Sequence, residues 1–428
     1  MTKSKLVFPV LTEKGFPKAV VANAIHALRE DRQWASVLAF DSFSIRTVAL
    51  HATPWENQGN HPFTPRAWSD IDDIHTAEWL QKKDVHVGPD VARQAVEVVA
   101  KRQEFHPVTD YLDSIVWDGR RRLASLASAY FGAEESAYTR DVSQAFMISA
   151  VARVKQPGCK VDTMPVFEGH QGAGKSSAMD ALFSPWFSDE MADPGSKDAA
   201  MQLQGAWCIE IAELDAFGKA ETTRIKAFLS RRKDRFRPPY GSRVSEFPRQ
   251  CVFAGTTNKD DYLRDETGGR RFWPIRCGRI NLEALQRDRD QLWAEARSSF
   301  QSGSAWWLDR TSSRAAAQEQ AERFADDPWR SSVVGWANER SDVSIPEILE
   351  QVLDVRKGDW KQPDQNRVAR ILIAERHGCG APIWERRRLT VNGSREWRYV
   401  RQPDPLEEER RVTQAVSKLR VVTGTDGK

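Results

Sequence analysis

The sequence has few of the residues that build metal centres and disulfide-stabilised folds. Its five cysteines stand at positions 159, 208, 251, 277 and 379, so no two fall within four residues of each other. The eight histidines form no pair at metal-ligand spacing either. This scatter argues against a zinc ribbon and a disulfide framework, and it fits the reducing environment of the cytoplasm.

Long apolar segments are also missing. No run of about 18 apolar residues occurs, so the sequence predicts neither a membrane span nor a membrane partner. The first residues, Met-Thr-Lys-Ser-Lys-Leu-Val-Phe-Pro, lack the apolar core and cleavage site of a signal peptide, and we expect a cytoplasmic protein. The net charge of +3 favours no class of partner, but the arginines are clustered along the chain.

One segment, residues 169–176, matches a phosphate-binding pattern at every position. It reads Gly-His-Gln-Gly-Ala-Gly-Lys-Ser, between an apolar stretch at 164–168 and a helix-permissive stretch at 177–183. Glycines let backbone N–H groups converge on a phosphate, and the following helix points its positive end there. The alternative is a chance match in a glycine-rich loop. We expect ATP to be bound by Gly169, Gly172, Gly174, Lys175, Ser176 and Ser177.

Within this loop, two side chains have separate expected roles. Lys175 would reach the β- and γ-phosphates, and Ser176 would ligate Mg²⁺. An acidic partner is expected from residues 206–215, which read Ala-Trp-Cys-Ile-Glu-Ile-Ala-Glu-Leu-Asp. Glu213 is the candidate that polarises the attacking water. Because Ala212 replaces the first acid of the usual Asp-Glu pair, metal ligation is weaker or comes from Glu210, with Asp215 a lesser candidate.

Two further motifs complete the expected catalytic set. Residues 251–258 form an apolar strand that ends in Asn258, whose amide would orient water near the γ-phosphate; strand ends often carry Asn in ordinary turns. Residues 268–274 read Gly-Gly-Arg-Arg-Phe-Trp-Pro. Arg270 or Arg271 would reach the γ-phosphate across a subunit boundary, an interaction worth several powers of ten in rate. The alternative is a surface turn with salt bridges.

A basic stretch lies between these motifs at 231–243, with Arg249 after it. Its arginines alternate with Phe236 and Tyr240, so cations could meet phosphates while rings meet bases. The other interpretation is a solvated charged face. The predicted DNA contacts are Lys226, Arg231, Arg232, Arg235, Arg237, Tyr240 and Arg243.

The order of patterns predicts an α/β fold. We expect a mixed α/β or helical region at 1–106, a helical collar at 107–160, a P-loop ATPase core of the AAA+ type at 161–310, a winged-helix-like domain at 326–402 and a charged tail at 403–428. Strands at 164–167, 207–211 and 251–255, with a helix at 284–300, indicate a parallel sheet in the core. Other helices are expected at 69–80, 91–100, 108–115, 122–129, 141–154, 346–353 and 365–377.

Two smaller features also carry expectations. Asp70, Asp72 and Asp73 stand at a helix start, where carboxylates near the dipole are far commoner than metal ligands. Asn392-Gly393, between two strand-like segments, is a strong hairpin signal. Helix, helix and basic hairpin suggest a winged helix, which could read an origin sequence or pack a ring.

The succession of motifs from about 105 to 300 resembles the virulence-associated protein E family. The likeness includes Trp-Asp-Gly-Arg at 117–120 and Pro-Gly-Cys-Lys at 157–160, besides the motifs above. It implies a superfamily 3 helicase ATPase from a phage or mobile island, forming a homo-hexamer that moves 3′-to-5′ on single-stranded or forked DNA. By that likeness Glu213 activates water, Asn258 is the sensor, Arg270 or Arg271 is the finger, and the basic stretch lines the channel. No primase module precedes the core, so any primase would be a separate chain.

Two other functions remain open at this stage. One is a DNA-dependent ATPase that switches or loads other factors without unwinding DNA. The other is a small-molecule kinase, although a kinase lid needs neither a basic aromatic segment nor a winged helix.

Overall fold

The computed structural model describes residues 6–56, 62–194, 196–214, 217–237, 243–259, 262–263, 269–323, 328–391 and 393–407. The chain divides into two compact units, one up to residue 324 and one from residue 325. Clusters of buried apolar side chains lie within each unit. Among the described residues, no helix is long and apolar enough to cross a membrane.

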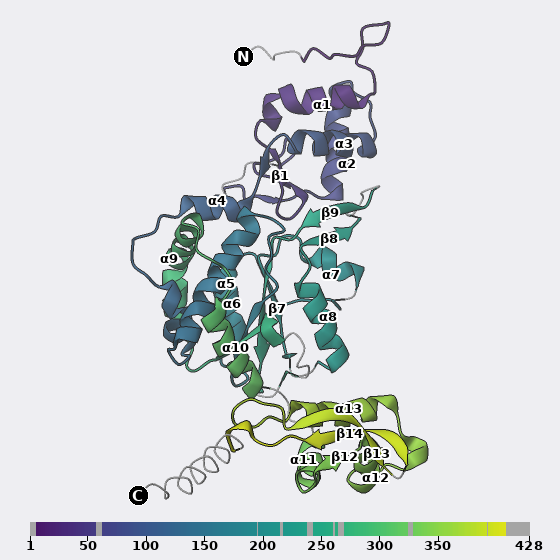
Figure 1. Ribbon diagram of the computed structural model, residues 1–428. Coiled ribbons are helices and arrows are strands. Elements are labelled where there is room, and N and C mark those ends of the chain that lie inside the picture. The colour runs from purple at the N-terminus through teal and green to yellow at the C-terminus, as the bar shows by residue number, and fades with distance from the viewer. Residues whose placement is uncertain are drawn as a thin grey trace, which may run out of the picture. The chain divides into compact units, whose positions relative to one another are not determined.

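The first hundred residues contain both helices and strands (Figure 1). Three helices, α1 (Val21–Glu30), α2 (Asp70–Gln81) and α3 (Pro89–Ala100), share a hydrophobic core with a sheet in the order β3-β2-β1-β4. Its strands are β1 (Leu38–Asp41), β2 (Arg46–Ala49), β3 (Arg66–Ala67) and β4 (Glu104–Phe105).

The carboxylates at the start of α2 are used within the fold. Asp72 accepts hydrogen bonds from the Ser69 hydroxyl at 2.6 Å and from the Arg66 guanidinium at 2.7 and 2.8 Å. Asp73 accepts one from the Trp68 indole at 2.9 Å. These side chains therefore cap the helix and bind its neighbours, as the sequence predicts.

The following region is helical but less regular than expected. It comprises α4 (Pro107–Ser114), the 3₁₀ turn η2 (Leu123–Ser125), the π turn η3 (Leu126–Tyr130) and α5 (Ala137–Lys155). The expected helix at 122–129 is thus two short turns. Its backbone N–H groups bond to side chains of other helices: Leu123 N to Glu295 at 3.0 Å and Ala127 N to Ser143 at 3.2 Å. Tertiary contacts override the local helical pattern here.

The core is a five-stranded parallel sheet in the order β11-β5-β10-β7-β6. Its strands are β5 (Met164–Glu168), β6 (Phe187–Ser188), β7 (Cys208–Ile211), β10 (Val252–Thr257) and β11 (Phe272–Arg276). Side chains on one face pack with α5, α6 (Lys175–Phe183) and α9 (Leu282–Gln301), and those on the other pack with α7 (Lys197–Gln202) and α8 (Lys219–Leu229) (Figure 1). The α/β class and the parallel sheet are confirmed.

Two of the five strands are absent from the sequence prediction. β6 has only two residues, too few for any periodicity. β11 contains Pro274, which donates no ladder hydrogen bond, and it directly follows the two arginines for which a surface turn is the alternative. The structure places β11 at the sheet edge, where proline is tolerated.

A separate two-stranded antiparallel sheet carries the basic stretch. It consists of β8 (Lys233–Phe236) and β9 (Ser245–Pro248), so the first part of this stretch is a strand; residues 238–242 lie outside the described residues. Arg249 fixes its base: the guanidinium binds both carboxylate oxygens of Asp234 at 2.8 and 2.6 Å and the Phe228 carbonyl at 2.5 Å. Both charged side chains are fully buried, so Arg249 is a structural residue.

The second unit combines three helices with a small sheet. The helices are α11 (Arg330–Asn338), α12 (Ile345–Gln351) and α13 (Gln362–Ala374), and β12 (Asp342–Val343), β14 (Ser394–Arg401) and β13 (Trp384–Val391) form a sheet in that order. Ser344 caps α12 through the Glu347 backbone. α13 ends before the predicted position because Arg376 bridges to Pro382. The winged-helix assignment stays a prediction; Asn392 and residues 408–428 of the predicted tail lie outside the described residues.

The last helix of the first unit is α10 (Arg310–Glu322), which packs against β11. Arg323, directly after it, pairs with the buried carboxylate of Glu168 at 2.6 Å. Glu168 ends β5, so the ion pair joins the end of this unit to the strand next to the sheet edge.

We expect Arg249→Met to destabilise the first unit by about 3–5 kcal/mol, because the Asp234 carboxylate stays buried without its partner. The measurement is equilibrium urea unfolding followed by circular dichroism. Lys233→Ala is the control, since it removes an exposed ion pair to Glu246 in the same hairpin and should cost at most about 1 kcal/mol. Equal losses in the two variants would contradict the structural role of Arg249.

Candidate functional site

A cavity of about 310 Å³ lies at the carboxyl ends of three adjacent core strands. Three short segments line it: residues 171–177 after β5, Glu210 to Glu213 at the end of β7, and Thr256 to Asn258 at the end of β10. Parallel strands present their carboxyl ends at one sheet edge, and ligands bind there in open α/β sheets. The structure thus brings the predicted phosphate loop, acidic segment and sensor Asn258 to one place.

The loop of residues 169–176, called the P-loop below, needs glycine at two bends. Gly172 has φ +77° and Gly174 has φ +89°, in the left-handed region that residues with a Cβ avoid. Gly174 also caps the start of α6. The bend therefore turns the free N–H groups and the positive end of α6 toward the cavity, which suits an anion.

Lys175 is largely buried, with 7% of its surface exposed. Its ammonium donates to the carbonyls of Gly169 at 2.6 Å and His170 at 2.9 Å and to the Asn258 side-chain oxygen at 3.1 Å. Burial lowers the pKa of this ammonium below its usual range. A phosphate would be a stronger partner than carbonyls for a partly desolvated cation, so the arrangement favours anion binding.

Glu210 connects the P-loop helix to the neighbouring strand. Its Oε1 accepts hydrogen bonds from the hydroxyls of Ser176 at 2.8 Å and Thr256 at 2.6 Å. Its Oε2 is buried and has no hydrogen-bond partner among the described residues. A buried carboxylate oxygen without a partner is costly, so a cation would be a favourable partner for this atom.

The oxygens around Glu210 fit Mg²⁺. Magnesium prefers oxygen ligands and usually binds through one or two carboxylates plus substrate phosphates and water. The Glu210 carboxylate and the Ser176 hydroxyl supply such oxygens. No group of three or more His, Cys, Asp or Glu side chains suited to a metal occurs in the described part of the chain, so protein ligands alone form no metal cage there.

Glu213 lies at the exposed edge of the same cavity. Its backbone has φ +51°, a left-handed conformation that is uncommon for residues other than glycine and is often found at functional sites. The side chain is thus held at the cavity edge by a strained turn directly after β7. Asp215 lies outside the described residues.

Arg270 and Arg271 lie at the other end of the sheet. They form a 3₁₀ turn just before β11, and β11 runs parallel to β5 with Phe272 opposite Met164 and Arg276 opposite Glu168. Since the P-loop follows the carboxyl end of β5, about 13 Å of strand separates these arginines from it. Arg270 is exposed, whereas Arg271 is half-buried and donates from Nε to the Ser230 hydroxyl at 3.0 Å.

The predicted DNA contacts divide into two groups. Arg231, Arg232, Arg235, Arg237 and Arg243 are exposed on or beside the β8–β9 hairpin. Lys226 is only 6% exposed, and its ammonium lies over the Phe272 ring at 5.7 Å, so it does not present its charge to DNA. Phe236 stacks on Phe247 at 4.5 Å inside the hairpin and is likewise not a surface ring. Tyr240 lies outside the described residues.

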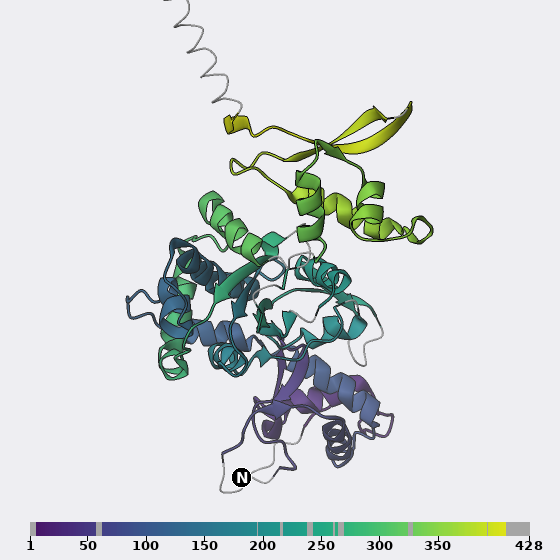
Figure 2. The ribbon, with the colours of Figure 1, turned by 90° about the horizontal axis from the view of Figure 1, so that it is seen from below.

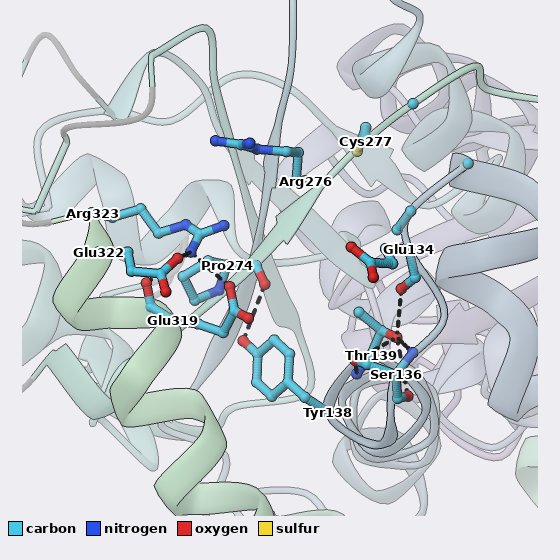
Figure 3. A pocket seen from close by; sticks show the side chains of 13 residues that line it. Glu134, Ser136, Tyr138, Thr139, Pro274, Arg276, Cys277, Glu319, Glu322 and Arg323 are labelled. Atoms are coloured by element: carbon cyan, nitrogen blue, oxygen red, sulfur yellow. Dashed lines mark hydrogen bonds and ion pairs between the residues drawn. The ribbon is translucent and has the colours of Figure 1, made fainter.

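A second cavity of about 470 Å³, which the sequence does not reveal, borders the other side of the P-loop strand (Figure 3). It is lined by residues between 132 and 139, which run from the segment before α5 into its first turn, by the end of β11 with the two residues after it, and by the end of α10. In Figure 3 the Tyr138 hydroxyl points to the Pro274 carbonyl, a hydrogen bond of 3.1 Å. Cys277, which lines this cavity, lies beside Gly169 of the P-loop. A Cβ added to Gly169 would be 3.6 Å from the Cβ of Cys277.

The second cavity depends on a close backbone approach between two glycines far apart in sequence. A Cβ on Gly278 would lie 2.4 Å from the Gly132 carbonyl oxygen, which no real contact allows. Burial raises the pKa of the adjacent Cys277 thiol to about 12, so this side chain is a neutral wall group. Gly132 and Gly278 are the residues through which the sequence could have indicated this cavity. Their importance becomes visible only when the fold brings the two glycines into contact.

Comparison with known proteins identifies one family. The model of the virulence-associated protein E-like domain matches residues 112–325, half of the chain. No curated protein matches.

Several solved structures of the NrS-1 C-terminal region are similar in outline. An apo structure of its residues 305–718 has 11% sequence identity and a TM-score of 0.43, covering 86% of this chain and 96% of that one. An A-form apo structure has 12% identity and a TM-score of 0.43, covering 85% and 96%. Sequence identities and TM-scores this low say nothing about the activity of this chain.

We expect Glu210→Gln to weaken ATP binding in the presence of Mg²⁺ by roughly tenfold or more, because one metal ligand loses its charge. Binding without Mg²⁺ should change little, since the P-loop contacts remain. The measurement is titration with a fluorescent ATP analogue, with Mg²⁺ and with EDTA. Equal weakening under both conditions would contradict a metal role for Glu210.

Proposed function

The chain belongs to the family of virulence-associated protein E-like domains, and from that premise we propose that it is an ATP-driven DNA helicase of the superfamily 3 type. It would act in the cytoplasm during replication of a phage or mobile genetic element. One observation carries the proposal: the cavity in which Lys175, Ser176, Glu210, Glu213 and Asn258 converge from three strand ends.

In this proposal ATP binds with its phosphates on the P-loop. The ammonium of Lys175 exchanges the carbonyls of Gly169 and His170 for the β- and γ-phosphates, and the N–H groups at the start of α6 bind phosphate oxygens. Ser176 and Glu210 would hold Mg²⁺, which would neutralise phosphate charge. Glu213 accepts a proton from the attacking water, and Asn258, freed from Lys175, orients that water.

The second cavity offers room for the nucleoside. It meets the P-loop at Gly169, on the side of the strand away from Glu210, and the two cavities together are large enough for a nucleotide. We propose that the base enters between residues 132–139 and the end of α10. This placement gives the collar residues before α5 a direct part in nucleotide binding.

The position of Arg270 and Arg271 supports an assembly. In their own subunit these arginines lie at the sheet end opposite the P-loop, so they are poorly placed for their own nucleotide. A ring, which we propose to be a homo-hexamer, would present them to the nucleotide of the next subunit. Each active site would then contain groups from two chains, as expected for a finger in trans.

The exposed arginines of the β8–β9 hairpin are the proposed DNA contact of the core. The strands alternate, so Lys233 and Arg235 face outward while Asp234 and Phe236 are buried. Arg235 has no carboxylate partner among the described residues, which leaves its charge available to a phosphate. Such contacts suit single-stranded or forked DNA and require no base specificity.

The alternative within this framework is a DNA-dependent ATPase that switches or loads other factors. It would use the same nucleotide residues, so the site does not separate the two. A strand-displacement assay on a forked duplex with ATP does: unwinding supports the helicase, and ATP turnover without unwinding supports the switch.

We expect single-stranded DNA to stimulate ATP hydrolysis, and Lys175→Ala to lower the stimulated rate by roughly 100-fold or more, because the phosphates lose their buried cation. Phosphate release is measured with and without DNA. Lys82→Ala, which changes a lysine that is 69% exposed directly after α2, is the matched control. If Lys175→Ala hydrolyses ATP as fast as the wild type, the assignment of the nucleotide site is wrong. If ATP hydrolysis by the wild type does not respond to DNA, the proposed DNA-driven helicase is wrong.

We expect Arg271→Ala and Glu213→Gln to be nearly inactive alone, with Arg271→Ala losing about 1000-fold, but to regain activity when mixed. Some mixed interfaces then combine the intact Glu213 of one chain with the intact Arg271 of its neighbour. ATPase rate is measured against mixing ratio, and Arg270→Ala is compared to decide which arginine is the finger. A mixture no more active than its components would argue against a finger in trans.

A further inference from the structure

The β13–β14 hairpin of the second unit has two unlike faces. Side chains of a strand alternate between faces, and the register pairs Arg386 with Tyr399, Arg388 with Trp397 and Thr390 with Arg395. These residues therefore share one face, called the Trp397 face below. The opposite face carries Glu385, Arg387, Glu396 and Arg398.

The arginines of the two faces differ in their partners. On the opposite face, Arg387 pairs with Glu385 at 2.5 Å, and Arg398 pairs with Glu347 at 2.8 Å and with Asp342. On the Trp397 face, Arg386, Arg388 and Arg395 have no carboxylate partner among the residues the structure describes. Three positive charges are thus left together without neutralisation, although acidic residues are available on the same two strands.

An exposed indole lies among these charges. Trp397 is 52% exposed, and the guanidinium of Arg386 lies over its ring at 4.5 Å, with that of Arg388 at 5.9 Å. A guanidinium stacked on a ring keeps its in-plane N–H donors, which match a phosphate in shape. Nearer the base of the hairpin, Trp384 and Tyr399 are buried in the core of the unit, so the exposed group stands on an anchored support.

The composition of this face favours a polyanion over a protein. A protein-binding centre is usually ringed by further apolar side chains, whereas the exposed neighbours of Trp397 here are three arginines and Thr390, the aromatic neighbour Tyr399 being buried. Cations around one aromatic ring are typical of surfaces that bind nucleic acid, where charges meet phosphates and the ring meets a sugar or base. Figure 2 shows the hairpin, in yellow, on one side of the helices of its own unit.

We propose that the Trp397 face binds DNA through the phosphate backbone, as a contact separate from the β8–β9 hairpin of the first unit. Arg386, Arg388 and Arg395 bind phosphates, and Trp397 holds two of these guanidinium groups in place. This contact requires neither ATP nor an intact P-loop. It gives the chain a second site for DNA, in a unit that lies almost wholly outside the matched family domain.

The test compares neighbouring arginines on opposite faces in the full chain. Fluorescence anisotropy with a labelled duplex and a labelled single strand, without ATP, gives affinity over a range of salt concentrations. We expect Arg386→Gln with Arg388→Gln to weaken binding several-fold and to lower the slope of log K against log salt by about 2, one per lost phosphate contact. Arg387→Gln removes the same charge from the opposite face and should bind as the wild type does.

A second variant separates the ring from the charges. Trp397→Leu should weaken binding with an unchanged salt slope, because no cation is lost. Urea unfolding midpoints equal to wild type show that the variants fold. The proposal is overturned if Arg387→Gln weakens binding as much as Arg388→Gln, or if the double variant binds both DNAs like wild type. A changed native mass with unchanged DNA binding would also overturn it, and would assign the face to a protein contact.

Discussion

The hydrogen bonds of the Glu210 carboxylate are the interaction on which the candidate site depends. Oε1 receives the hydroxyls of Ser176, on the P-loop helix, and of Thr256, on the next strand. These two bonds fix three elements at one sheet edge, and they leave Oε2 buried and available. The second contact between the same segments, from Lys175 to Asn258, is one that a phosphate would replace. In the proposed site, the groups on the metal side would keep their hydrogen bonds when nucleotide binds, whereas those on the phosphate side would exchange theirs.

The local sequence patterns are sufficient to predict the phosphate-binding part of this site. Residues 169–176 must bend at glycines whatever surrounds them, and apolar strands ending in Glu210 and Asn258 must converge once the sheet is parallel. The second cavity is different, because Gly132 and Gly278 acquire their meaning only when the fold brings them within contact. Likewise β11 escapes prediction because its residues directly follow the arginine-bearing turn, and only their pairing with β5 identifies them as a strand.

The roles of the arginines also depend on the fold and not on the local sequence. The chain places Arg249 and Arg323 in buried ion pairs with Asp234 and Glu168. Arg235 and Arg388 lie at the surface and have no such partner within the described ranges. Nothing in the local sequence separates these uses, since Arg249 and Arg235 belong to one basic stretch. Partner carboxylates distant along the chain decide whether an arginine stabilises the fold or remains available to a ligand. Lys226 and Phe236 are likewise expected from the sequence to contact DNA, but both side chains are buried in the fold.

Helix α8 joins three of the features described above. It begins a few residues after Glu213, and its C-cap residue Ser230 receives the Nε hydrogen bond of Arg271. Three residues further on, β8 opens the basic hairpin. With eleven residues, the helix is about 16 Å long. In the proposed motor, α8 would act as a connecting rod between the turn at Glu213 and the pair formed by Arg271 and β8. A shift of the helix along its axis on loss of the γ-phosphate would then move the finger and the hairpin together. Nucleotide turnover in one subunit would then be timed with its own stroke on DNA and with catalysis in its neighbour.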